Sequence, residues 1–233
     1  LRVIEVPHAF NGLAQLAHLD MSYMSFGQMI LAPGMFSALA GLTKLSLQSS
    51  TLYEWAFQPN GSTFRGLGRL HTLVLTGNKL RFVRPDTFGG DGLRSLVLLK
   101  LDAAWIATLN DTNAFRGLDT TLQTLDLSRN LLQAIHARTF SCLRRLRQLY
   151  LSGCKKLRVL EPGAFDGLVS LQSLWLSGSP LRLLNSEYFA RLDSLRNVFL
   201  TEAQQPEQAD EALLVVVDPD DDTLLQQDFS DHG

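Results

Sequence analysis

The sequence lacks several features that define whole classes of protein. Its apolar runs, such as Ala212 to Val217, fall far short of the roughly 20 residues that a membrane-spanning helix needs. No charged-then-apolar targeting segment opens the chain, and Leu1 stands where an initiator Met would. We therefore expect a piece of a longer protein, whose parent can still carry a signal peptide or an anchor. With 45% hydrophobic residues and a net charge of -2, the 233 residues suit an ordinary globular chain with a real core.

Chemical motifs are also scarce. The five histidines show no metal-ligand spacing, and the chain has no Gly-rich phosphate loop or nucleophile elbow. Asp218, Asp220 and Asp222 alternate as in a calcium loop, but the loop Gly is missing and the twelfth position is Phe229 instead of Glu. These absences predict a protein that is not an enzyme and that uses no cofactor and no metal.

What the chain does have is a repeat. A short "L-x-L" core recurs at intervals of 24 to 28 residues, and a Phe precedes each core in step with it. Such a fixed period is typical of a solenoid. The cores begin at Leu19, Leu45, Leu73, Leu99, Leu125, Leu149, Leu174 and Val198, and the Phe markers are Phe10, Phe36, Phe64, Phe88, Phe115, Phe140, Phe165 and Phe189.

Each core predicts a short strand whose Leu side chains point inward while the x residues point outward. One coil cannot bury its own apolar side chains, so neighbouring coils must stack. The stretch from Leu122 to Leu132, with Leu125, Leu127 and Asn130 between, resembles the leucine-rich repeat "L-x-x-L-x-L-x-x-N/C-x-L". The resemblance implies an α/β-type repeat solenoid, a leucine-rich repeat horseshoe segment with a concave parallel β-sheet and an irregular convex side.

The repeats are expected to fill residues 1–203, about eight in all with the first one partial. Residues 204–233 form an acidic tail that fits the pattern poorly and is interpreted as an irregular last repeat or a cap. At the position where the repeat pattern has Asn, only two repeats of this chain have it. We expect irregular turns at Met24, Ala104 and Ala203, because these side chains cannot make the hydrogen bonds of the Asn amide.

Two Asn-x-Ser/Thr sequons fall on expected loops, at Asn60 and Asn110, and predict glycosylation of an extracellular protein. Two ordinary polar turns are the alternative. Cys154 takes the Asn position, whereas Cys142 lies on the other side of the coil, farther away than the roughly 7 Å that a disulfide spans. We therefore predict two unpaired, mostly buried thiols.

The concave face is the expected binding surface, since the middle x residues of the strands line up there. This row reads Asp20, Ser46, Val74, Lys100, Asp126, Tyr150, Trp175 and Phe199. Its last three residues predict an exposed aromatic patch for a ligand or a protein partner, with Arg129 and Gln148 as polar contacts beside it. Burial of these rings beneath the tail or beneath a further segment is the alternative.

Charge is distributed unevenly. Residues up to 201 carry 21 basic and 13 acidic side chains (21 - 13 = +8), whereas the tail from Glu202 carries ten acidic ones. This asymmetry suggests an interaction tail or an anionic partner. However, Arg144, Arg145 and Arg147 precede a strand and Lys155, Lys156 and Arg158 follow it, so they divide between two edges of the sheet and disfavour a nucleic-acid track.

The stretch from Phe115 to Leu132, "FRGLDTTLQTLDLSRNLL", resembles Toll-like receptor ectodomains. The resemblance implies an extracellular innate immune segment that binds a protein or microbial ligand and signals through a receptor homodimer or heterodimer, with the membrane span in another part of the parent. A secreted or matrix leucine-rich repeat adhesion protein is the alternative.

Overall fold

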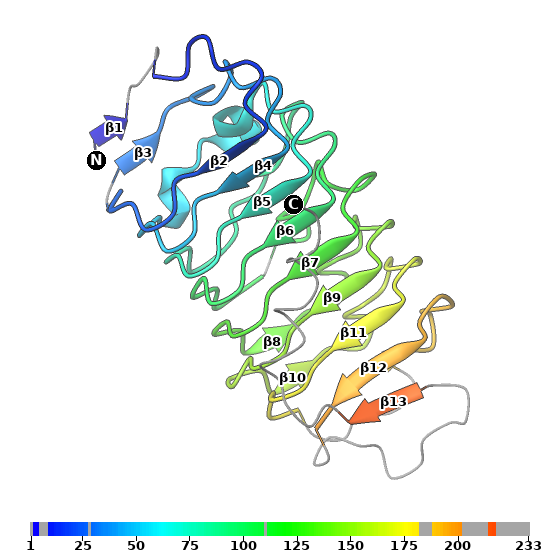
Figure 1. Cartoon of the computed structure of the whole chain (residues 1–233). Helices are drawn as coiled ribbons and strands as arrows, with labels where there is room; N and C mark the ends of the chain where they lie inside the picture. The colour runs from blue at the N-terminus through cyan, green and yellow to red at the C-terminus, as the bar shows by residue number, and fades with distance from the viewer. Residues whose placement is uncertain are drawn as a thin grey trace.

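The computed structural model describes residues 2–4, 9–27, 29–109, 111–181, 188–201 and 214–217. These residues form a stack of coils with one long parallel sheet along one side (Figure 1). The sheet strands are β2 (His18–Asp20), β4 (Lys44–Ser46), β5 (Thr72–Val74), β6 (Leu98–Lys100), β7 (Thr124–Asp126), β9 (Gln148–Tyr150), β11 (Ser173–Trp175), β12 (Asn197–Leu200) and β13 (Leu214–Val217). This is the predicted solenoid, with little helix.

The remaining elements are short and lie outside the long sheet. Two parallel pairs form separate small sheets, and two 3-10 helices follow β4. They are β1 (Arg2–Ile4) with β3 (Met29–Leu31), β8 (Ala134–Ile135) with β10 (Val159–Leu160), and the helices η1 (Glu54–Ala56) and η2 (Pro59–Phe64). The side of the coils away from the sheet is thus irregular, as the sequence predicts.

The predicted boundary near residue 203 falls among residues that the structure does not describe. Of the tail, only β13 is described, and it pairs in parallel with β12, from Asn197 opposite Leu214 to Leu200 opposite Val217. The Asp218 to Asp222 segment and Ala203 lie outside the described residues.

Leu and Phe fill the inside of every coil. From β2 to β11 the central Leu of each strand lies opposite the central Leu of the next, and Val198 takes this place in β12; these side chains are fully buried from Leu45 to Val198. Most of the Phe markers stack on the marker of a neighbouring coil, with ring centroids 6.3 Å apart for Phe64–Phe88 and 6.5 Å apart for Phe88–Phe115. The two sequence markers are therefore the two opposite walls of one continuous core.

Just after each strand, the chain turns through a residue in the left-handed backbone conformation. Its φ lies between 51° and 70° in seven successive coils, at Tyr23, Ser49, Gly77, Ala103, Arg129, Gly153 and Gly178. From Tyr23 to Gly153, the N–H of this residue donates to a carbonyl of the next coil, over 2.7 to 2.9 Å. The turn therefore extends the hydrogen bonding of the sheet beyond the strands.

The buried Asn side chains bind the turn to the preceding coil. The Asn130 amide donates to the carbonyls of Leu101 and Leu127, both at 2.8 Å, and its oxygen accepts the Ile106 N–H at 2.9 Å. Asn78 repeats this arrangement and accepts from both Ser50 and Leu52. One planar amide thus satisfies buried backbone donors and acceptors that water cannot reach.

Where a turn lacks Asn, other groups accept the hydrogen bonds of the buried backbone N–H groups. Ala104 has no polar side chain, and the N–H of Leu80 donates instead to the Ala104 carbonyl at 2.9 Å. The turn is irregular there, since Trp105 also adopts a left-handed φ of 60°. At Met24, the backbone N–H donates to the Ser50 hydroxyl at 3.2 Å. The turn of Ala104 departs from its neighbours at the point where the sequence led us to expect it.

We predict that Asn130→Ala destabilises the fold by about 3 kcal/mol, because the Ile106 N–H and the Leu101 carbonyl lose their partner and each buried unpaired group costs about 1 to 3 kcal/mol. Urea unfolding of the variant measures the loss. The control is Asn113→Ala at an exposed site, which should change stability little. Equal stabilities for the two variants would contradict a structural role for the buried amide.

Candidate functional site

The strand register places the middle x residues in one row across the sheet. Asp20, Ser46, Val74, Lys100, Asp126, Tyr150, Trp175 and Phe199 lie opposite one another in that order, and Val216 of β13 follows. The row is the one that the repeat spacing predicts. Because the inward Leu residues alternate with it, the row lies on the face of the sheet turned away from the core.

Tyr150, Trp175 and Phe199 form a stack of rings, here called the aromatic ladder. The centroids of Tyr150 and Trp175 are 3.9 Å apart with planes inclined by 13°, and those of Trp175 and Phe199 are 4.6 Å apart and inclined by 2°. The sequence predicts an exposed patch, whereas the structure makes all three side chains half-buried. Face-to-face stacking accounts for part of this burial, since the Trp175 ring has a neighbour on each face.

The two polar residues expected beside the ladder are placed differently from each other. Gln148 shares the strand and the face of Tyr150, and its side-chain oxygen accepts a hydrogen bond from Thr124 Oγ1 at 2.9 Å. Arg129 extends instead toward the preceding coil, where its guanidinium pairs with Asp102 Oδ2 at 3.0 Å. Gln148 therefore borders the ladder directly, while Arg129 is engaged in an ion pair with the neighbouring coil.

Two buried acids are functional candidates that the sequence reasoning missed, one beside the ladder and one a coil farther along. Asp126 lies opposite Tyr150, and Asp102 accepts from Thr76 Oγ1 at 2.6 Å as well as from Arg129. Burial raises the pKa of the Asp126 carboxyl, and the nearby Asp102 charge raises it further. Asp126 already stood in the predicted row, but its burial depends on neighbouring coils and could not be read from one repeat.

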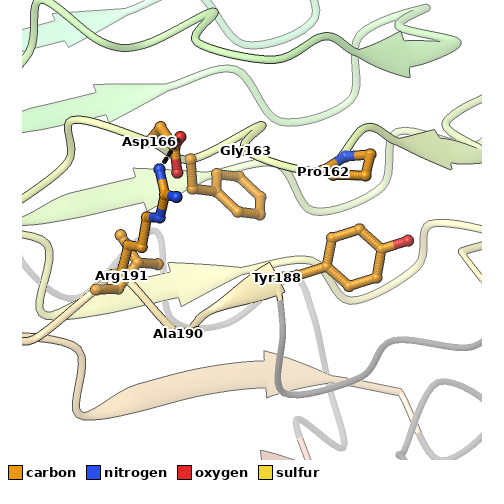
Figure 2. Close-up of a pocket in the computed structure, with 8 residues that line it drawn as sticks. Pro162, Gly163, Asp166, Tyr188, Ala190 and Arg191 are labelled. Atoms are coloured by element: carbon orange, nitrogen blue, oxygen red, sulfur yellow. Dashed lines mark hydrogen bonds and ion pairs between the residues drawn. The ribbon is translucent and has the colours of Figure 1, made fainter.

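A separate pocket of about 330 Å³ lies between consecutive coils (Figure 2). Phe165, whose ring stacks on that of Phe189, is part of its lining. Asp166 and Arg191 meet at one side of it, with Arg191 Nη1 2.9 Å from Asp166 Oδ2, and Tyr188 lies at the other. The ion pair links two coils and satisfies both charges. The pocket contains no described nucleophile beside a base, so it offers no catalytic arrangement.

The cysteines and the sequons are the remaining features predicted from the sequence. Cys142 and Cys154 are unpaired, as predicted, and burial raises the pKa of each thiol to about 11, so both are protonated at neutral pH. Asn60 is exposed, whereas Asn110 lies outside the described residues. Within the described ranges, no cluster of three or more side chains suits a metal ion, and no helix is long and apolar enough to cross a membrane.

Comparison with known proteins agrees with this geometry. The leucine-rich repeat family profile matches residues 108–155. Mouse (Mus musculus) podocan-like protein 1 is 33% identical over 84% of this chain and 32% of its own length, and mouse Toll-like receptor 9 is 31% identical over 83% of this chain and 20% of its own length. The solved complex of TLR13 with ssRNA13 matches with a TM-score of 0.59 and 28% identity, over 79% of this chain and 28% of that one.

The chain is a leucine-rich repeat protein, and it resembles a segment of a Toll-like receptor ectodomain. It spans a third or less of the length of podocan-like protein 1 and of both Toll-like receptors. The repeat fold of these relatives is in general a binding module and not an enzyme scaffold, and the relatives include both receptors and podocan-like proteins.

The raised pKa of Asp126 predicts a pH-dependent stability. Because folding favours the protonated carboxyl, the buried charge costs stability above the folded-state pKa, and this cost disappears as the pH falls to the unfolded value. Asp126→Asn should therefore raise the melting temperature at pH 7, with a smaller gain in acid.

Asp20→Asn is the matched control for this pH prediction. Hydrogen bonds from Ser22 lower the pKa of Asp20, so its charge contributes stability that is present above the unfolded pKa and lost as the pH falls through the folded one. Thermal melts between pH 3 and pH 7 compare the two variants. A lower melting temperature for Asp126→Asn at pH 7 would contradict the assignment.

Proposed function

We propose that this chain is an extracellular ligand-recognition segment of a Toll-like innate immune receptor, which binds its ligand or partner through the concave face. The observation that carries the proposal is the aromatic ladder. Three large rings from three adjacent strands, Tyr150, Trp175 and Phe199, stack in register on the outward face of the sheet. Aromatic side chains held rigidly on a scaffold are typical anchors of protein interfaces.

The chemistry beside the ladder favours a protein partner over a nucleic acid. The TLR13 structure was solved with single-stranded RNA, and single strands bind through base stacking and a basic groove. Here the rings already stack on one another, and the next residue in the row is the buried acid Asp126 and not a basic residue. A partner that offers apolar side chains suits this surface better than a chain of phosphates does.

The ladder is tested with Trp175→Ala. The chain is screened against an array of purified secreted proteins and receptor ectodomains, and the affinity of each hit is then measured with wild type and variant. We expect Trp175→Ala to lower the affinity for the partner by about 30-fold or more. This corresponds to a loss of about 2 kcal/mol, the value that defines an interface anchor. Loss of two stacking contacts should cost stability as well, about 0.5 to 1.5 kcal/mol for each pair.

Trp105→Ala is the control for the binding experiment. Trp105 is exposed but lies outside the ladder, after the turn of its coil. Its removal should leave the affinity unchanged. A partner that binds Trp175→Ala as tightly as wild type, or loses as much affinity with Trp105→Ala, would refute the ladder as the contact surface.

Glycosylation is part of the same proposal, because a secreted chain meets the enzymes that attach glycans to sequons during its export. Asn60 is exposed at a turn that Gly61 closes, with the Gly61 N–H donating to the Asp86 carbonyl at 2.9 Å. In material secreted from mammalian cells, Asn60→Gln and Asn110→Gln should each reduce the glycan mass found by mass spectrometry. Asn113→Gln, outside any sequon, should not. Unmodified Asn60 and Asn110 would argue against an extracellular chain.

A secreted or matrix binding protein is the second candidate, favoured by the similarity to podocan-like protein 1. The two candidates differ in the part of the parent that follows Gly233. Sequencing the parent transcript distinguishes them. A hydrophobic span of about 20 residues followed by a signalling domain supports the receptor, whereas a Cys-rich cap followed by a stop codon supports the secreted protein.

A further inference from the structure

The same face of the sheet is hollowed near its other end. The hollow, here called the polar hollow, has a volume of about 900 Å³ and extends across β2, β4, β5 and β6. Three steps of about 4.8 Å between strands give it a length of roughly 14 Å. Most of its lining residues have polar side chains, among them the acids Asp20 and Asp102 and the lysines Lys44 and Lys100, and Asp102 also pairs with Arg129.

Hydrogen bonds hold the polar side chains of the hollow in fixed orientations. The hydroxyls of Ser22 and Ser46 lie 2.7 Å apart, and the Gln48 side chain donates to the Tyr23 hydroxyl at 3.2 Å. Lys44 and Thr72 make no hydrogen bond or ion pair with another described side chain. The hollow therefore combines oriented hydroxyls and an amide with donors that are left for a ligand.

Tyr23 gives the polar hollow an apolar wall. Its side chain is 73% exposed although it belongs to the turn that links β2 to the rest of its coil. The Tyr23 N–H donates to the Gln48 carbonyl at 2.7 Å, and the Gln48 amide bonds the hydroxyl at the other end of the ring. The backbone and the hydroxyl of Tyr23 are thus both bonded to Gln48 of the neighbouring coil, while the ring stays open to solvent.

We propose that the polar hollow is a binding site for a neutral oligosaccharide. A sugar ring has an apolar C–H surface, which packs on an aromatic ring, and a rim of hydroxyls, each of which donates and accepts hydrogen bonds. Tyr23 supplies the first contact, and Gln48, Thr72 and Lys44 supply the second. The length of the hollow suits a short oligosaccharide.

Charge and polarity disfavour the other ligand classes. A nucleic acid or a sulfated polysaccharide needs several basic groups in surplus. Here Asp20 offsets one of the two lysines, and Asp102 is already paired with Arg129, so the hollow has only one basic charge in surplus. An apolar peptide would leave the Lys44 ammonium and the Thr72 hydroxyl without partners in a dry interface. The site is distinct from the aromatic ladder and does not depend on the function proposed for it.

The test is an array of neutral oligosaccharides built from glucose, mannose, galactose and N-acetylhexosamines, with a heparin hexasaccharide as the anionic comparison. Titration calorimetry then measures the strongest neutral binder. We expect Tyr23→Ala to weaken it about tenfold or more, and Gln48→Ala to weaken it as well. Circular dichroism establishes that both variants are folded; should either unfold, Thr72→Ala replaces it.

Two controls make the result specific. Trp105 is also an exposed aromatic residue, with the same φ of 60° as Tyr23, but it lies outside the hollow, so Trp105→Ala should bind the sugar like wild type. Trp175→Ala should also bind it like wild type, which separates this site from the ladder. The proposal is overturned if no neutral glycan binds, if only heparin binds, or if Tyr23→Ala retains the full affinity.

Discussion

Everything in this molecule depends on the contact between one coil and the next. A single coil of about 25 residues cannot close around its own Leu and Phe side chains, so both walls of its core are completed by neighbours. The backbone makes this contact continuous. Strand pairs exchange hydrogen bonds from β2 to β13, and the left-handed residues from Tyr23 to Gly153 each donate one more bond to the next coil. The buried amides of Asn78 and Asn130 then fasten the turn from inside.

This frame explains how a row of side chains becomes a functional surface. Because the register never shifts from Asp20 to Phe199, each outward residue has a fixed neighbour on both sides. Similar residues in adjacent coils therefore form extended features, such as the aromatic ladder from three rings. Where neighbouring coils carry different residues, the surface changes character from one strand to the next, as at Asp126, which lies between Lys100 and Tyr150. The fold fixes where each outward side chain lies, and the identity of these side chains determines which ligand the surface can bind.

The sequence predicted the coils and strands of the solenoid well, but it predicted the exposure and the contacts of the outward side chains less well. The spacing of Leu and Phe gave the strands, their register and the outward row, because each repeat encodes its own coil. The half-burial of Trp175 and the burial of Asp126 depend on residues one coil away, which a single repeat does not contain. Arg129 was expected beside the ladder, but its position one residue before Asn130 puts it in the left-handed turn, and its side chain reaches Asp102 in the preceding coil. The polar hollow was missed because it combines residues from four strands and the turns after them.

The left-handed turn also bears on which residues serve a ligand. Glycine adopts this conformation without strain, as at Gly77 and Gly153, whereas other residues pay roughly 1 to 2 kcal/mol. Ser49 and Ala103 carry the same strain without a candidate role, so the conformation alone does not mark a functional residue. What distinguishes Tyr23 is that its side chain stays open to solvent while its hydroxyl accepts a hydrogen bond from the Gln48 amide. A strained and exposed aromatic residue contributes little to the core, and its place in the polar hollow gives it a role in binding that Ser49 and Ala103 lack.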